Sequence, residues 1–231
     1  MAATPTPRTS ERFCAPDADL TISSSDSVLF KVHHKNLEFH SDIFANAANA
    51  TRPENGDEIV HLEEPADVLD VLFQYMYRQP QPDLQLIDFS VFMGFAEAAE
   101  KYAVYSALTV MKIQMKEHIT NHPLHVLDFA ARHGHADLAN EAARMTVGLR
   151  MSDAATILAP DTFKKWMTFH DDWHAEARAA VSDLIWHITA HNRETICPIF
   201  AQCARDPKLW YKNRSTLWST SFLSIEFMSV D

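Results

Sequence analysis

The sequence is poor in glycine and cysteine. Its 231 residues include 4 Gly and 3 Cys. With so few glycines, the chain contains no Gly-x-Ser-x-Gly string, P-loop or Gly-x-Gly-x-x-Gly string, so the motifs that mark many enzymes are missing. Cys14, Cys197 and Cys203 are an odd number at irregular spacing and suggest no disulfide framework. We therefore expect a protein of a reducing compartment, the cytoplasm or the nucleus.

Long apolar runs and excess positive charge are also missing. No stretch approaches the roughly 20 apolar residues of a transmembrane helix, and the first 13 residues lack the apolar segment of a secretory signal. The formal net charge is -11, and residues 17–122 hold 17 acidic and 7 basic side chains. Because such a surface repels phosphate backbones and anionic lipids, we expect protein partners and neither a nucleic-acid nor a membrane partner.

What the chain does contain is material for a core. Hydrophobic residues make up 47% of it, with 14 Phe and 5 Trp, so global disorder is not expected. Residues 1–16 are the exception: Pro5, Pro7 and Pro16 stand among small and polar residues and predict a disordered tail. Between residues 19 and 37, apolar and polar residues alternate on both sides of a Ser-Ser-Ser-Asp turn, which predicts a β-hairpin with one buried face.

The rest of the chain is mostly helical in pattern. A short helix is expected around Ile43, a strand at 59–62, and a helix that begins after Pro65. Helical periodicity then continues over 89–102, 105–119, 124–133, 137–149 and 161–190. The predicted fold class is α+β and predominantly helical, with a small sheet flanked by a helix cluster over residues 17–122 and an all-α extension over 123–231.

Several strings resemble the BTB/POZ family. The hairpin and the helix after it match the family pattern D-L-x-L…S-S-D-x-x-x-F-x-V-H…L…S-x-x-F, and the string AEAAEKYAV at 96–104 is similar to a helix-turn-helix sequence common in that family. Residues 126–144, VLDFAARHGHADLANEAAR, resemble the paired helices that follow the domain in short fungal members. The matching positions are Asp19, Ser25, Asp26, Phe30, His33, Leu37, Ser41, Phe44 and Tyr102.

The resemblance implies a non-enzymatic module, without a cofactor, that self-associates and docks partner proteins. A dimer face is expected on the hairpin and first helix, at Leu20, Ile22, Leu37 and Phe44, although these four residues fit the core of the monomer equally well. Few residues precede Asp19, and three of them are Pro, which argues against the strand-exchanged dimer that many family members form. His33 and Ser41 are interpreted as polar residues that tie the hairpin to the helix through buried hydrogen bonds.

Two alternative functions remain open. Family members that recruit a cullin ubiquitin-ligase scaffold often carry a hydrophobic-x-Glu motif, and the corresponding segment here, NAANATRPENGDE, has no clear copy. The other alternative is a zinc site made of His187, His191, Cys197 and Cys203, because side chains four apart on a helix share a face. A second histidine pair, His170 and His174, is predicted to lie on a hydrated, exposed helix face.

Overall fold

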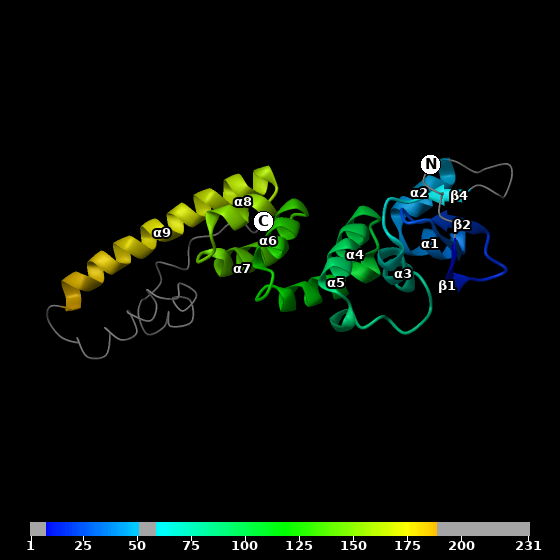
Figure 1. Cartoon of the computed structure of the whole chain (residues 1–231), viewed down its shortest axis with the longest axis horizontal. Coiled ribbons are helices and arrows are strands. Elements are labelled where there is room, and N and C mark those ends of the chain that lie inside the picture. Colours follow the sequence, from blue (N-terminus) through cyan, green and yellow to red (C-terminus); the bar gives the residue numbers. More distant parts are fainter. Residues whose placement is uncertain (1–7, 51–58, 189–231) are drawn as a thin grey trace, which may run out of the picture. The chain divides into compact units, whose positions relative to one another are not determined.

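The computed structural model describes residues 8–50 and 59–188. The chain divides after Gln114 into two compact units. In the first, a four-stranded sheet lies beside helices (Figure 1). Its strands, in the order β1-β3-β2-β4, are β1 (Arg8–Cys14), β3 (Val28–Val32), β2 (Leu20–Ser23) and β4 (Ile59–His61). β2 and β3 form the predicted hairpin, with Ile22 opposite Phe30, and both edge strands run parallel to their neighbours.

Strand β1 contradicts the prediction of a disordered tail at residues 8–14, while residues 1–7 of that prediction lie outside the described residues. It pairs with β3 of the same chain, with Arg8 opposite Val28. Phe13 is buried, and its ring lies 5.6 Å from that of Phe73 and 5.3 Å from that of Tyr77. One large aromatic side chain therefore stabilises a strand whose other residues are mostly exposed. A strand with so few buried positions lacks the alternation that sequence analysis detects.

Six helical segments complete the first unit. They are α1 (His34–His40), α2 (Asp42–Ala50), α3 (Ala66–Gln74), the 3-10 helix η1 (Leu84–Leu86), α4 (Phe89–Lys101) and α5 (Tyr105–His118). The short helix expected around Ile43 is a pair, α1 and α2, because Ser41 has extended backbone angles and forms a β-bridge with Val104. α3 and α4 pack against each other, and Phe73 of α3 contacts Phe30 of the sheet. The α+β fold class is thus confirmed.

The second unit contains only helices in its described part. These are the end of α5, then α6 (Pro123–Arg132), α7 (Ala136–Thr146), α8 (Met151–Ile157) and α9 (Pro160–Ile188). α6 and α7 form the main helix pair, and small buried residues such as Ala139 and Ala143 let their backbones approach closely. Gly134 ends α6 with a φ of 74°, a conformation that glycine adopts without strain.

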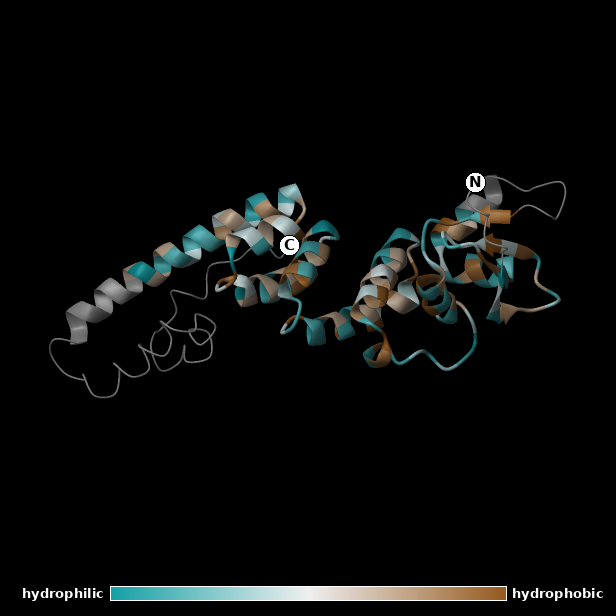
Figure 2. Cartoon of the chain, viewed as in Figure 1, coloured by the Kyte–Doolittle hydropathy of each residue, from teal (hydrophilic) through white to brown (hydrophobic). Residues whose placement is uncertain are grey.

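The division between the units lies inside α5, earlier than the boundary that the sequence suggested after residue 122. α5 continues without interruption to His118, just before the polar residues 120–122. The boundary between the two compact units therefore does not coincide with the end of this helix. Teal and pale residues recur along the first part of α9 (Figure 2), which matches its amphipathic pattern. Within the described ranges, no helix has both the length and the apolar character to cross a bilayer.

Candidate functional site

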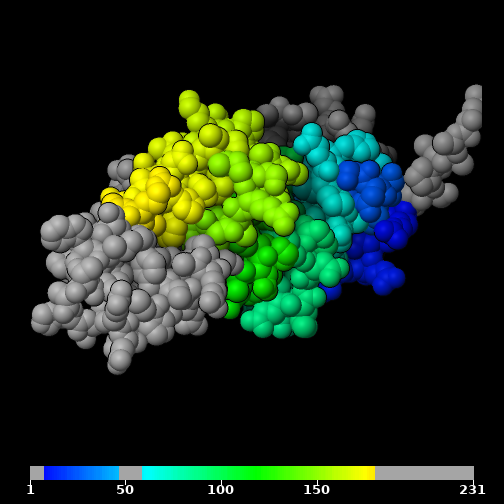
Figure 3. Space-filling model, turned by 60° about the vertical axis from the view of Figure 1, so that its left-hand side comes forward, coloured from blue at the N-terminus to red at the C-terminus, as the bar shows by residue number. Residues whose placement is uncertain are grey.

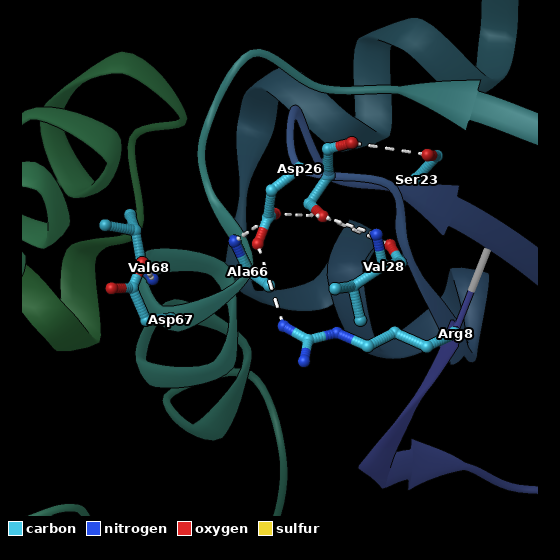
Figure 4. A network of polar contacts seen from close by, with 8 residues as sticks. Arg8, Ser23, Asp26, Val28, Ala66, Asp67 and Val68 are labelled. Carbon is cyan, nitrogen blue, oxygen red and sulfur yellow. Dashed lines mark hydrogen bonds and ion pairs between the residues drawn. The ribbon is translucent and has the colours of Figure 1, made fainter. Parts of the chain in front are cut away.

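Asp26 joins the hairpin turn to the start of α3 (Figure 4). Its carboxylate accepts hydrogen bonds from the Ser24 hydroxyl, at 2.6 Å, and from the backbone N–H of Ala66, at 2.8 Å. Arg8 of β1 lies 3.9 Å from the same carboxylate. Burial raises the pKa of Asp26, but these hydrogen bonds outweigh burial and lower the pKa below its ordinary value. Asp26 is therefore a structural carboxylate, held charged at the first turn of α3.

A second carboxylate joins the loop before α3 to the end of α4. Glu64 accepts a hydrogen bond from the Tyr102 hydroxyl at 2.7 Å and forms an ion pair with Lys101 at 2.8 Å. Lys101 also reaches Glu63 at 3.1 Å. Burial raises the pKa of Glu64, whereas the contacts with Lys101 and Tyr102 lower it and prevail. Lys101 thus bridges two carboxylates, of which Glu64 is the more buried, and joins the loop before α3 to the end of α4.

Ser41 ties α1 and α2 to the turn after α4. Its buried hydroxyl donates a hydrogen bond to the carbonyl oxygen of Tyr102 and accepts one from the backbone N–H of Phe44 at 3.2 Å. The Phe44 ring stacks on the Tyr102 ring at 4.9 Å between centroids. The hydrogen bond of Ser41 is buried, but it reaches the turn after α4 and not the hairpin, to which the sequence predicts a connection.

His33 and Asp19 fix the entry to α1. The backbone N–H and Nδ1 of His33 both contact the hydroxyl oxygen of Tyr77, at 2.8 and 3.1 Å. The carboxylate of Asp19 accepts a hydrogen bond from the backbone N–H of His34 at 2.7 Å and so satisfies a free donor at the helix start. His33 therefore contacts the segment after α3 through Tyr77, and its side chain is only partly buried, whereas the sequence predicts a buried hydrogen bond between the hairpin and the helix after it.

The predicted dimer face is only partly at the surface. Ile22 and Leu37 are 0% exposed and belong to the core of the monomer, and Leu20 and Phe44 are partly buried. The prediction is therefore wrong for Ile22 and Leu37. The alternation that places Ile22 on the apolar face of the hairpin turns that face toward the helices, so Ile22 is used in the monomer core.

The large exposed apolar side chains of the first unit lie elsewhere. Phe39 at the end of α1 is 83% exposed, and Ile43 in α2 is 46% exposed. Tyr105, at the start of α5, is 60% exposed, and its hydroxyl donates a hydrogen bond to Asp42 at 3.0 Å. We call Phe39, Ile43 and Tyr105 the α1–α2 surface. Sequence reasoning missed Phe39. It lies two residues after the buried Leu37 in the same short helix, so its side chain is on the other side of the helix.

The C-terminal zinc hypothesis stays a prediction. His187 belongs to α9, but its side chain and the residues His191, Cys197 and Cys203 lie outside what the structure describes. Across residues 8–50 and 59–188, no group of three or more His, Cys, Asp or Glu side chains is placed to hold a metal ion. A complete tetrahedral site of the structural zinc type is thus not found within those ranges.

The comparisons with known proteins agree with this fold. The family model of the BTB/POZ domain matches residues 9–119. A search of curated proteins gave no match. The matched range begins one residue into β1 and ends one residue after α5, so it contains the sheet except for Arg8, together with the described helices of the first unit.

Proposed function

Because residues 9–119 form a BTB/POZ domain, we propose that this chain is a non-enzymatic interaction protein that self-associates and docks other proteins through that domain. BTB/POZ domains are protein–protein interaction modules. The reducing compartment expected from the three cysteines places this role in the cytoplasm or the nucleus. The observation that carries the proposal is the α1–α2 surface, where large apolar side chains remain in water after the domain has folded.

Burial of this surface supplies the driving force for self-association. Apolar area removed from water contributes about 25 cal/mol per Å², before the cost of association is subtracted. Phe39 is a rigid aromatic side chain with few rotamers to lose, the type of residue that dominates binding energy in interfaces. Since β1 pairs with β3 of its own chain, association through the α1–α2 surface needs no exchange of strands.

The test is the mass of the full chain in solution. We expect a dimer at tens of micromolar by size-exclusion chromatography with light scattering, and a monomer for Phe39→Glu, because a carboxylate cannot be buried unpaired in an apolar interface. Leu86→Glu is the matched control: Leu86 is 84% exposed, against 83% for Phe39, but it lies in η1, outside the α1–α2 surface. A wild-type chain that stays monomeric, or a Phe39→Glu variant that stays dimeric, contradicts the proposal.

A second candidate function is that of a substrate adaptor for a cullin-type ubiquitin ligase. The observation that favours a further partner is the exposed apolar face of α5, where Val110 and Ile113 are 39% and 65% exposed and lie three residues apart on one side of the helix. If this face binds a cullin, Ile113→Glu abolishes co-purification of the chain with a co-expressed cullin, and Leu86→Glu does not. Absence of the wild-type complex refutes this candidate and leaves the first one intact.

A further inference from the structure

His170 and His174 stand one helical turn apart on α9, and their rings face each other. Their Nε2 atoms lie 3.1 Å apart, and their ring centroids 4.3 Å apart. The prediction of an exposed, hydrated face is wrong for this pair, because the side chain of His170 is only 16% exposed. Figure 3 shows this part of α9 in yellow, beside the yellow-green spheres of the residues that precede it. The two imidazole rings therefore lie close together at a position that is only partly exposed to solvent.

Packing fixes the position of the pair. Trp166 is fully buried, and its Nε1 donates a hydrogen bond to the Thr146 hydroxyl of α7 at 2.7 Å. The His170 ring lies 4.9 Å from the Trp166 ring, and the His174 ring lies 5.0 Å from the ring of the buried Trp173. Because two anchored indoles flank the imidazoles, the pair loses little further freedom when a ligand binds.

The distance between the two nitrogens suits a metal chelate. Imidazole nitrogens bind Zn²⁺ at about 2.0–2.1 Å. Two such nitrogens at coordination angles between 90° and 109° are about 2.8–3.4 Å apart, and the observed 3.1 Å falls inside this range. Imidazole is also the ligand that zinc and copper prefer among nitrogen donors in proteins.

The second ring nitrogen of His170 lies near a carboxylate. When both Nε2 atoms bind a metal, the proton of His170 moves to Nδ1. That atom lies 3.8 Å from the carboxylate of Asp171, which is placed to accept the proton's hydrogen bond after a small movement.

We propose that the Nε2 atoms of His170 and His174 together bind one divalent transition-metal ion of the copper or zinc class, with water completing its coordination. The site is distinct from the four-ligand zinc hypothesis at residues 187–203 and does not depend on self-association of the BTB/POZ domain. Two protein ligands leave positions open on the metal, so we expect an exchangeable ion and not a buried structural one.

The fluorescence of the two flanking tryptophans can report metal binding. Copper(II) is paramagnetic, and within a few ångströms of Trp166 and Trp173 it quenches their fluorescence. We expect saturable quenching when Cu²⁺ is added to the full chain, reversal by excess Zn²⁺, and loss of this component in His170→Gln/His174→Gln. The matched control is His187→Gln/His191→Gln, which removes another histidine pair at the same spacing on the chain and should keep the quenching.

A single substitution is included because the double variant could lose the signal simply by misfolding. His174 is only partly buried, whereas Trp166 is fully buried, so His174→Gln is expected to keep the wild-type circular dichroism and melting temperature. Loss of a protein ligand then weakens Cu²⁺ binding by at least about tenfold. Folded His174→Gln with an unchanged quenching midpoint overturns the proposal, as does a quenching component that disappears only in His187→Gln/His191→Gln.

Discussion

At the scale of single residues, the polar positions of the domain act as connections between segments distant in the sequence. Ser41 reaches Tyr102, Asp26 reaches Ala66, and Glu64 reaches Tyr102. Each hydrogen bond joins a loop or helix end to another element, and those of Ser41 and Asp26 also satisfy a backbone acceptor or donor. The family pattern of polar residues is thus explained by hydrogen bonding and requires no chemistry.

Ser41→Ala tests the most buried of these connections. The substitution leaves the Tyr102 carbonyl oxygen and the Phe44 N–H without their partner, so we expect a loss of about 1–3 kcal/mol in the free energy of unfolding. Urea unfolding measures the effect. Ser25→Ala, at an exposed position on the hairpin turn, is the control and should change stability by less than about 0.5 kcal/mol. Equal effects of the two substitutions would contradict the assigned role of Ser41.

Tyr75→Phe is expected to act in the opposite direction. Tyr75 is 1% exposed, and among the described residues its hydroxyl has no hydrogen-bond partner. Burial raises the pKa of Tyr75 to about 12, consistent with a hydroxyl far from water. Removing that hydroxyl keeps the stacking of the ring on Phe95 and should stabilise the chain by about 1 kcal/mol. A thermal melt that shows destabilisation instead would reveal a partner for this hydroxyl.

At the scale of elements, the packing of α3 on α4 depends on the absence of one side chain. Gly94 lies in the middle of α4, where glycine is unfavourable by about 1 kcal/mol relative to alanine. A Cβ atom at Gly94 would lie 2.7 Å from Cγ2 of Val68, which is buried in α3. Since valine is stiff about χ1, it cannot turn away cheaply. The close approach of the two helices therefore outweighs helix propensity.

Gly94→Ala is consequently expected to destabilise the domain by about 1–2 kcal/mol, despite the better helix propensity of alanine. The control is the same substitution in a Val68→Ala background, where the clash is gone and Gly94→Ala should be neutral or stabilising. A double-mutant cycle measured by urea unfolding gives the interaction energy directly. Stabilisation by Gly94→Ala in the wild-type background would show that the helices are not in close contact.

At the scale of the whole molecule, the titratable groups of the two units respond to different ranges of pH. In the second compact unit, which begins at Met115, burial, followed by the neighbouring histidines, lowers the pKa of His118, His125 and His170 below the ordinary value of 6.5. In the first unit, the pKa of the carboxyls of Asp26 and Glu64 is lowered from ordinary values of 3.8 and 4.5. A fall in pH from neutral therefore affects the second unit before the first.

The melting temperature should accordingly fall as the pH is lowered from 7.5 to 5.5. A histidine with a lowered pKa in the folded state takes up protons more readily when unfolded, so its contribution is complete above pH 6.5 and decreases below that value. The two carboxyls contribute nothing to this decrease, because their contribution to the stability of the fold is lost only at still lower pH. Circular dichroism melts test this, and His125→Gln should flatten the dependence. A melting temperature that rises toward pH 5.5 would contradict the assignment.

Much of the fold could be predicted because it depends on local pattern. The hairpin follows from alternating residues around 20–32, and the helices from periodic apolar residues, with Gly134 marking the end of α6. The BTB/POZ domain was recognisable because its connecting polar residues stand at fixed spacings. These features depend on the order of residues along the chain, and order is what a sequence contains.

Other features depend on contacts between segments distant in the sequence, and only the tertiary structure decided them. Phe13 makes β1 a strand through contacts with Phe73 and Tyr77, distant in the sequence. Ile22 and Leu37 belong to the core and Phe39 to the surface, although all three are simply apolar in the sequence. His170 and His174 face each other beside anchored indoles instead of water. In each case, an apolar or titratable side chain has several possible environments, and long-range packing selects one of them.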